Sequence, residues 1–80
     1  MKLTRKAFDA WLAKQPARRF GTGNFLNDNG KPHCPLGHWG MTGYERRLPG
    51  WAVDFYYAVD ALGSTHVTTA RALRILRAIP

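Results

Sequence analysis

The sequence predicts a mainly α-helical fold, with one small domain over residues 1–80 built from three to four short helices. Three stretches place apolar side chains at intervals of three and four residues, the period of a helix with one buried face. A proline or a threonine stands where each helix would begin, as helix starts favour. Residues 18–33 lack such a period and are rich in Gly and Asn, so we expect a loop or a weak β-hairpin there.

The composition suits one packed domain. Of the 80 residues, 45% are hydrophobic, which is too many for a disordered chain, and no repeat or linker divides them. The single cysteine, Cys34, excludes a disulfide within the chain, so packing must stabilise the fold and a reducing compartment suits it. The residues expected to be largely buried are Trp11, Trp51, Phe55, Leu62, Leu73 and Leu76.

The first helix is expected over residues 5–15. Thr4 is its predicted N-cap, and Leu3 and Phe8 have the spacing of a hydrophobic staple around that cap. Pro16 closes the helix because proline interrupts helical hydrogen bonding. The apolar face carries Phe8, Trp11 and Leu12.

The segment of residues 17–33 predicts a loop or weak hairpin. Asn29-Gly30 is a turn signal, but Pro32 restricts any strand beside it to a sheet edge. Gly21-Thr22-Gly23 is a poor phosphate-binding loop, because the other elements of a nucleotide loop are missing.

Two helix starts follow in the middle of the chain. Cys34-Pro35 predicts a short helix with Leu36 and Trp39 inward, because proline is favoured at the first helical position. Pro49 opens the next helix, and Gly63 stops it. Its apolar face carries Trp51, Phe55, Ala58, Val59 and Leu62, and its polar face Asp54, Tyr57 and Asp60. We expect the two aspartates to be solvated or to pair with Arg46 and Arg47.

The last helix is predicted over residues 69–79, capped by Thr68. Its inward residues are Ala72, Ile75, Leu76 and Ile79, and its outward residues are Arg71, Arg74 and Arg77. This outward arginine stripe carries no acidic residue within its own helix.

The net charge of +7 is concentrated at the two ends of the chain. Such a field attracts polyanions and acidic protein surfaces without distinguishing them, and a charged face that serves solubility alone is the alternative. The N-terminal residues show no signal-peptide or membrane-span pattern, so we expect a cytoplasmic protein of a bacterial host.

The chain contains Phe8-x-x-Trp11-Leu12 and then Cys34-Pro35-Leu36, followed by the apolar and capping residues of the last two helices. Taken in order, these residues resemble a group of small uncharacterised proteins of bacteria and their phages. This group usually has alanine after Cys-Pro-Leu, where this chain has Gly37, and the departure is expected to loosen the middle helix. The chain's size and basic charge are also similar to those of phage anti-defence proteins such as anti-CRISPRs, which act by stoichiometric binding. This is an analogy with a type of protein, without a shared motif. The resemblance rests on Phe8-x-x-Trp11-Leu12, Cys34-Pro35-Leu36, Leu48-Pro49-x-Trp51 with Phe55 and Asp60, and Val67-Thr68 with Ala72-Leu73 and Ile75-Leu76.

Cys34 is the most reactive-looking residue. A cysteine at a helix N-terminus can have its thiolate favoured by the helix dipole, and His33, His38 or His66 could supply a base or share a metal. Signatures of cysteine hydrolases and paired zinc-ligand spacing are missing, and free cysteine is usually buried. We therefore expect no enzyme activity, no metal and no cofactor, with a Cys34/His hydrolase as a minor alternative.

The arginine stripe carries the functional hypothesis. Three arginines without nearby acids repel one another, which favours an acidic partner. We expect a small basic non-enzymatic protein, encoded by a phage or mobile element, that binds an acidic protein surface stoichiometrically. An inhibitor of a host defence complex such as CRISPR–Cas is the example by analogy. The alternative is nucleic-acid binding, because Gly63 and a Thr-rich turn before the last helix weakly resemble a helix-turn-helix. The predicted partner-binding residues are Arg71, Arg74, Arg77, Arg18, Arg19, Lys6 and Tyr57.

Overall fold

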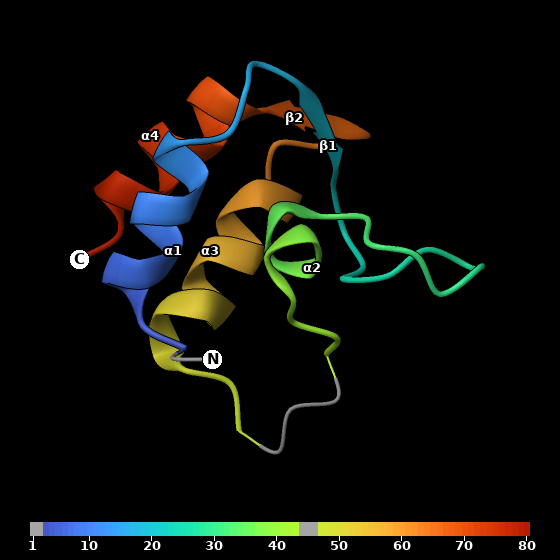
Figure 1. The fold of residues 1–80 in the computed structure, drawn as a ribbon, viewed down its shortest axis with the longest axis horizontal. Helices are drawn as coiled ribbons and strands as arrows, with labels where there is room; N and C mark the ends of the chain where they lie inside the picture. The colour runs from blue at the N-terminus through green and yellow to red at the C-terminus, as the bar shows by residue number, and fades with distance from the viewer. Residues whose placement is uncertain (1–2, 44–46) are drawn as a thin grey trace.

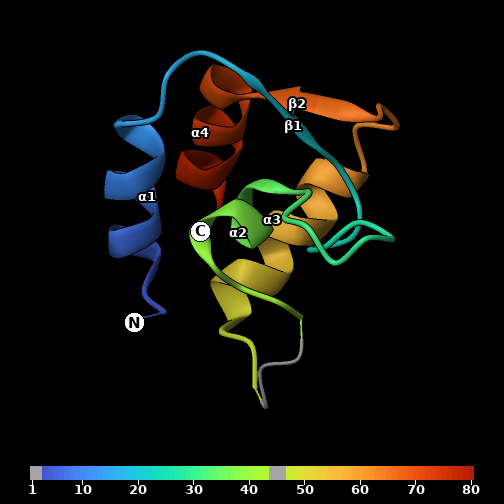
Figure 2. The same cartoon turned by 45° about the vertical axis from the view of Figure 1, so that its right-hand side comes forward.

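The computed structural model describes residues 3–43 and 47–80. In chain order its elements are α1 (Arg5–Ala13), β1 (Arg19–Gly21), α2 (Pro35–Trp39), α3 (Gly50–Asp60), β2 (His66–Thr68) and α4 (Thr69–Ala78). The four helices within these ranges agree with the predicted mainly helical fold. Figures 1 and 2 show α1 and α4 side by side, with the two strands crossing one end of the molecule.

Side-chain caps fix the starts of three helices where the sequence predicts them. Thr4 accepts a hydrogen bond from the Ala7 N–H, and Thr68 accepts one from the Arg71 N–H. The thiol of Cys34 accepts the Gly37 N–H at the start of α2. The first and last helices end slightly earlier than predicted, α1 at Ala13 and α4 at Ala78.

The expected weak hairpin at residues 18–33 is only partly formed. Asn27 closes the turn, because its side chain accepts the N–H groups of Asn29 and Lys31. A single antiparallel bridge joins Leu26 to Pro32. The segment is therefore a turn with one bridge, and its regular strand, β1, pairs elsewhere.

The partner of β1 is β2, a strand that the sequence analysis missed. The two run antiparallel, with Phe20 opposite Val67 and Arg19 opposite Thr68. Phe20 and Val67 are both buried, so this pair seals the core beneath the sheet. A three-residue strand is too short to show a period in the sequence, which is why the sequence predicts only the cap at Thr68 here.

The core contains a cluster of aromatic rings around Phe8. Its ring contacts those of Trp11, Trp39, Trp51 and Phe55, with centroids 5.0–5.9 Å away. The fully buried large side chains are those of Phe8, Phe20, Phe55, Leu12, Leu36, Met41, Leu76 and Pro35.

Of the residues predicted to be largely buried, Phe55 and Leu76 are fully enclosed. The others are partly buried and pack against the core: Trp11, Trp51, Leu62 and Leu73. Tryptophan is large and carries a polar N–H, so it is seldom fully enclosed. The Trp51 indole N–H donates to the Leu3 carbonyl at the edge of the core. Leu62 follows the last turn of α3 and packs on the core from its side.

Gly37 allows a close approach between α2 and the loop before it. A Cβ atom at this position would overlap the carbonyl oxygen of Phe25. The expectation that Gly37 loosens the middle helix is therefore wrong. The missing side chain lets the Phe25 backbone lie directly against α2.

Candidate functional site: a basic face on α1 and α4

The predicted arginine stripe lies on the exposed side of α4, and one of its members is paired. Arg77 donates from Nε and Nη2 to the two carboxylate oxygens of Asp9 on α1, at 3.1 and 3.2 Å. These hydrogen bonds lower the pKa of Asp9 below its ordinary value. The expectation of three arginines with no acid nearby is thus wrong for Arg77, because the fold brings an acid from a distant helix.

Arg71 and Arg74 are the members of the stripe that stay exposed without an acidic partner among residues 3–43 and 47–80. They are three positions apart and therefore neighbours on the helix surface. Neither forms an ion pair within the described residues, so this pair can attract an anion.

Lys6 is the exposed lysine of α1, the helix that packs against α4. The two helices pack together, and Arg5 donates to the carbonyl oxygen of Pro80 at 3.1 Å beside the Asp9–Arg77 pair. Lys6 and Asp9 line one open hollow of about 530 Å³ on α1. We call the exposed cations Lys6, Arg71 and Arg74 the basic face.

Arg18 is held away from the basic face by contacts with aromatic rings. Its guanidinium lies 4.4 Å from the centroid of the Phe20 ring and donates to His38 Nδ1 at 2.8 Å. Partial burial, and then the charge of Arg18, lower the pKa of His38 below its ordinary value. A neutral imidazole can accept the Arg18 hydrogen bond, so this pair is a structural contact, and Arg18 keeps its charge at an exposed position.

Arg19 lies on the solvent side of β1, opposite Thr68. Because Phe20 and Val67 point into the core, their neighbours on each strand point outward. Arg19, together with the loop before β2, lines a separate groove. It therefore lies near the start of α4 and apart from the hollow on α1.

Tyr57 is the exposed large apolar residue of the described structure, with 65% of its surface accessible. Its ring meets that of Tyr56, and the two tyrosines line a small groove with Phe25, Leu48 and Val53. Tyr57 thus belongs to an apolar surface on α3.

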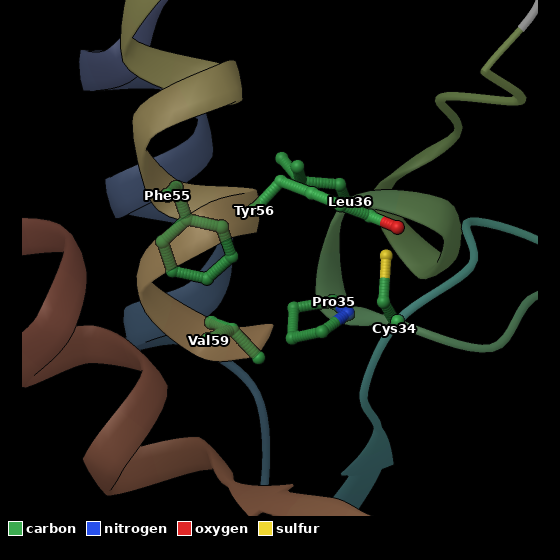
Figure 3. Close-up of a pocket in the computed structure, with 7 residues that line it drawn as sticks. Cys34, Pro35, Leu36, Phe55, Tyr56 and Val59 are labelled. Atoms are coloured by element: carbon green, nitrogen blue, oxygen red, sulfur yellow. The ribbon is translucent and has the colours of Figure 1, made fainter. Parts of the chain in front are cut away.

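Cys34 is buried between α2 and α3. Figure 3 shows it beside Pro35, with Phe55 and Val59 facing them from α3. Burial raises the pKa of the Cys34 thiol, an effect that the Gly37 N–H opposes only in part. The expectation that the helix dipole favours a thiolate is therefore wrong here, since desolvation outweighs it.

The three histidines make their hydrogen bonds away from this thiol. His33 Nε2 bonds to the Thr22 carbonyl, His38 to Arg18, and His66 Nδ1 to the Thr65 hydroxyl. In the described ranges no group of three His, Cys, Asp or Glu side chains is placed to hold a metal ion. His66 is an exposed residue of β2.

The connection between α3 and α4 does not form the turn of a helix-turn-helix. Gly63 has φ of +66° after the end of α3, as predicted for a helix stop. The chain then enters β2, which pairs with β1 before α4 begins. A strand built into the sheet replaces the short turn that this motif requires.

Asp54 and Asp60 on α3 are both exposed, as expected. Arg47 pairs with neither of them, and Arg46 lies outside the described residues.

None of the helices in residues 3–43 and 47–80 has the length and apolar character needed to span a membrane.

Comparison with protein-family models, curated proteins and solved structures finds no match in any of the three. The resemblance to small bacterial and phage proteins therefore stays a prediction.

Proposed function

We propose that this protein is a non-catalytic binding protein that holds an acidic protein surface against its basic face. The observation that carries the proposal is the exposed pair Arg71 and Arg74, which has no acidic partner in the described structure. Arginine is favoured at protein interfaces because its planar guanidinium binds carboxylates through two hydrogen bonds. Both side chains keep this capacity available for a partner.

The packing of α1 on α4 supports a rigid binding surface. The Asp9–Arg77 ion pair and the Arg5–Pro80 contact join the two helices. A surface held by such contacts loses less conformational freedom on binding than a flexible arm would. Lys6 adds a cation on the α1 side, so an acidic surface could engage both helices.

The absence of a catalytic role is part of the proposal. The thiol that the sequence favoured as a nucleophile is 3% exposed, and its raised pKa disfavours the reactive thiolate. The setting that we propose is the cytoplasm of a bacterial host. A host defence complex such as CRISPR–Cas is the proposed target class, by analogy with small basic phage inhibitors.

Nucleic-acid binding is the second candidate. The same unpaired arginines would attract phosphates, since a basic surface does not distinguish polyanions at long range. The paired strand before α4 removes the helix-turn-helix argument, so this candidate rests on charge alone.

Capture from a bacterial lysate by the immobilised protein tests both candidates, with and without nuclease treatment. The test variant carries Arg71→Glu and Arg74→Glu, and the control carries Lys31→Glu and Arg47→Glu, at exposed positions outside α1 and α4. Both pairs change the net charge by four units, from +7 to +3.

We expect the parent and the control to retain the same proteins after nuclease treatment, and the test variant to lose them. If the parent retains nothing once nucleic acid is digested, the partner is nucleic acid. If the test variant captures the same proteins as the parent, the basic face is only a solvated surface and the proposal is wrong.

A further inference from the structure

A polar groove lies at the strand end of the molecule, away from the hollow on α1. It has a volume of about 350 Å³ and is lined by Arg19, Ser64, Thr65, His66 and Thr68. The lining offers one guanidinium, one imidazole and three hydroxyl groups, and no acidic side chain. All of its polar side chains can donate hydrogen bonds, so the groove suits a small anion.

The groove is built by the pairing of β1 with β2. Arg19 lies opposite Thr68 in the sheet, with both side chains on the solvent side. Thr22, just after β1, holds the loop before β2 through two hydrogen bonds, from its N–H to the Thr65 carbonyl and from its hydroxyl to the Ser64 carbonyl. The lining residues are therefore positioned by backbone contacts before any ligand arrives.

Arg19 is the charged group of the groove, and it has no acidic partner in the described structure. Its neighbour Arg18 contacts Phe20 and His38 and does not line the groove. The groove also adjoins the N-terminus of α4, whose first turn contains no acidic residue to compete with a bound anion.

We propose that this groove binds one phosphate group, in the form of free phosphate or a small phosphomonoester. A phosphomonoester carries about 1.5 to 2 negative charges and three strong acceptor oxygens, which suits one guanidinium surrounded by several hydroxyl donors. No aromatic side chain lines the groove, so a nucleobase would find no stacking platform in it. The recognised chemistry is thus the phosphate itself, and the proposal does not depend on the function proposed for the basic face.

Nuclear magnetic resonance titration of the full chain with inorganic phosphate, at constant ionic strength, tests the proposal. We expect saturable shifts at the amides of Arg19 and of residues 64–68. Arg19→Gln should weaken phosphate binding at least tenfold, and Thr65→Val, which removes one hydroxyl at similar volume, should weaken it severalfold. Arg74→Gln, a matched loss of one exposed arginine outside the groove, should change it less than twofold.

Several outcomes would overturn the proposal. The shifts could fail to saturate with phosphate, acetate could bind the same amides equally tightly, or Arg19→Gln could bind like the parent. A duplex oligonucleotide with 5′-hydroxyl ends, bound at these amides more tightly than phosphate, would instead assign the groove to a nucleic-acid backbone. A spectrum of each variant recorded before phosphate is added shows whether that variant is folded.

Discussion

Close contacts at single residues decide how this small chain packs. Gly37 and Gly50 show the contrast, because both are helical glycines but only one has a close neighbour. The Phe25 backbone occupies the place of a side chain at Gly37, whereas a Cβ at Gly50 would meet no heavy atom within 4 Å beyond its chain neighbours and the backbone of its own helix. Alanine should therefore have opposite effects at the two positions.

Gly37→Ala should destabilise the fold by about 1–3 kcal/mol, because the loop carrying Phe25 must move away from α2. Gly50→Ala, the control, should be neutral or stabilising by up to about 1 kcal/mol, since alanine favours the helix. Urea unfolding of the two variants measures both values. Equal stability of Gly37→Ala and the parent would show that α2 and the loop are not in close contact.

The lowered pKa of His38 predicts that the stability of the fold depends on pH. Its pKa in the folded chain is below the ordinary value of 6.5, chiefly because of burial and then because of Arg18. As pH falls below about 6.5, the unfolded chain therefore takes up a proton more readily than the folded chain. As the pH falls from about 6.5 to the pKa of His38 in the folded chain, the free energy of unfolding should therefore decrease. Below that pKa, protonation of His38 should cause no further decrease.

Urea unfolding at pH values from 7.5 downwards measures this effect, with His38→Gln as the test and His66→Gln as the control. His38→Gln should lose part of the acid sensitivity, while His66→Gln, at an exposed strand position, should retain it. Identical pH profiles of His38→Gln and the parent would contradict the role given to the Arg18–His38 contact.

Elements differ in how far their positions follow from local sequence. The caps at Thr4, Cys34 and Thr68 could be predicted, because a cap depends on residues within one turn. The strand β2 could not, because Val67 is a strand residue only through its pairing with Phe20, far away along the chain. The same holds for the site, since Arg77 meets Asp9 only after α1 packs on α4.

The ring contact between α3 and α1 leads to a prediction about how much helix packing stabilises the fold. Phe55 is 1% exposed and meets the Phe8 ring edge to face, with centroids 5.3 Å apart. Phe55→Ala should therefore cost about 3–5 kcal/mol, a large part of the stability of so small a domain. Tyr57→Ala, at an exposed position of the same helix, should change stability far less. Thermal or urea unfolding separates the two, and a small effect of Phe55→Ala would place the core elsewhere.

Across the whole molecule, the fold and the basic face should be separable. Lys6, Arg71 and Arg74 are exposed and outside the aromatic core, so charge changes there leave the packing intact. Surface substitutions of this kind usually alter stability by about 0.5 kcal/mol or less each. Arg77 is different, because replacing it by glutamate would place two carboxylates together at Asp9. The variant that tests binding therefore changes Arg71 and Arg74 and leaves Arg77 in place.

The most direct test of the account is the association of the Arg71→Glu, Arg74→Glu variant with the purified captured partner. The parent and the Lys31→Glu, Arg47→Glu control are measured beside it, after melting curves show that all three are folded. The account predicts that the test variant associates at least about tenfold more slowly than the other two, because opposite charges steer the encounter. Equal association rates and affinities for the test variant and the parent would contradict it.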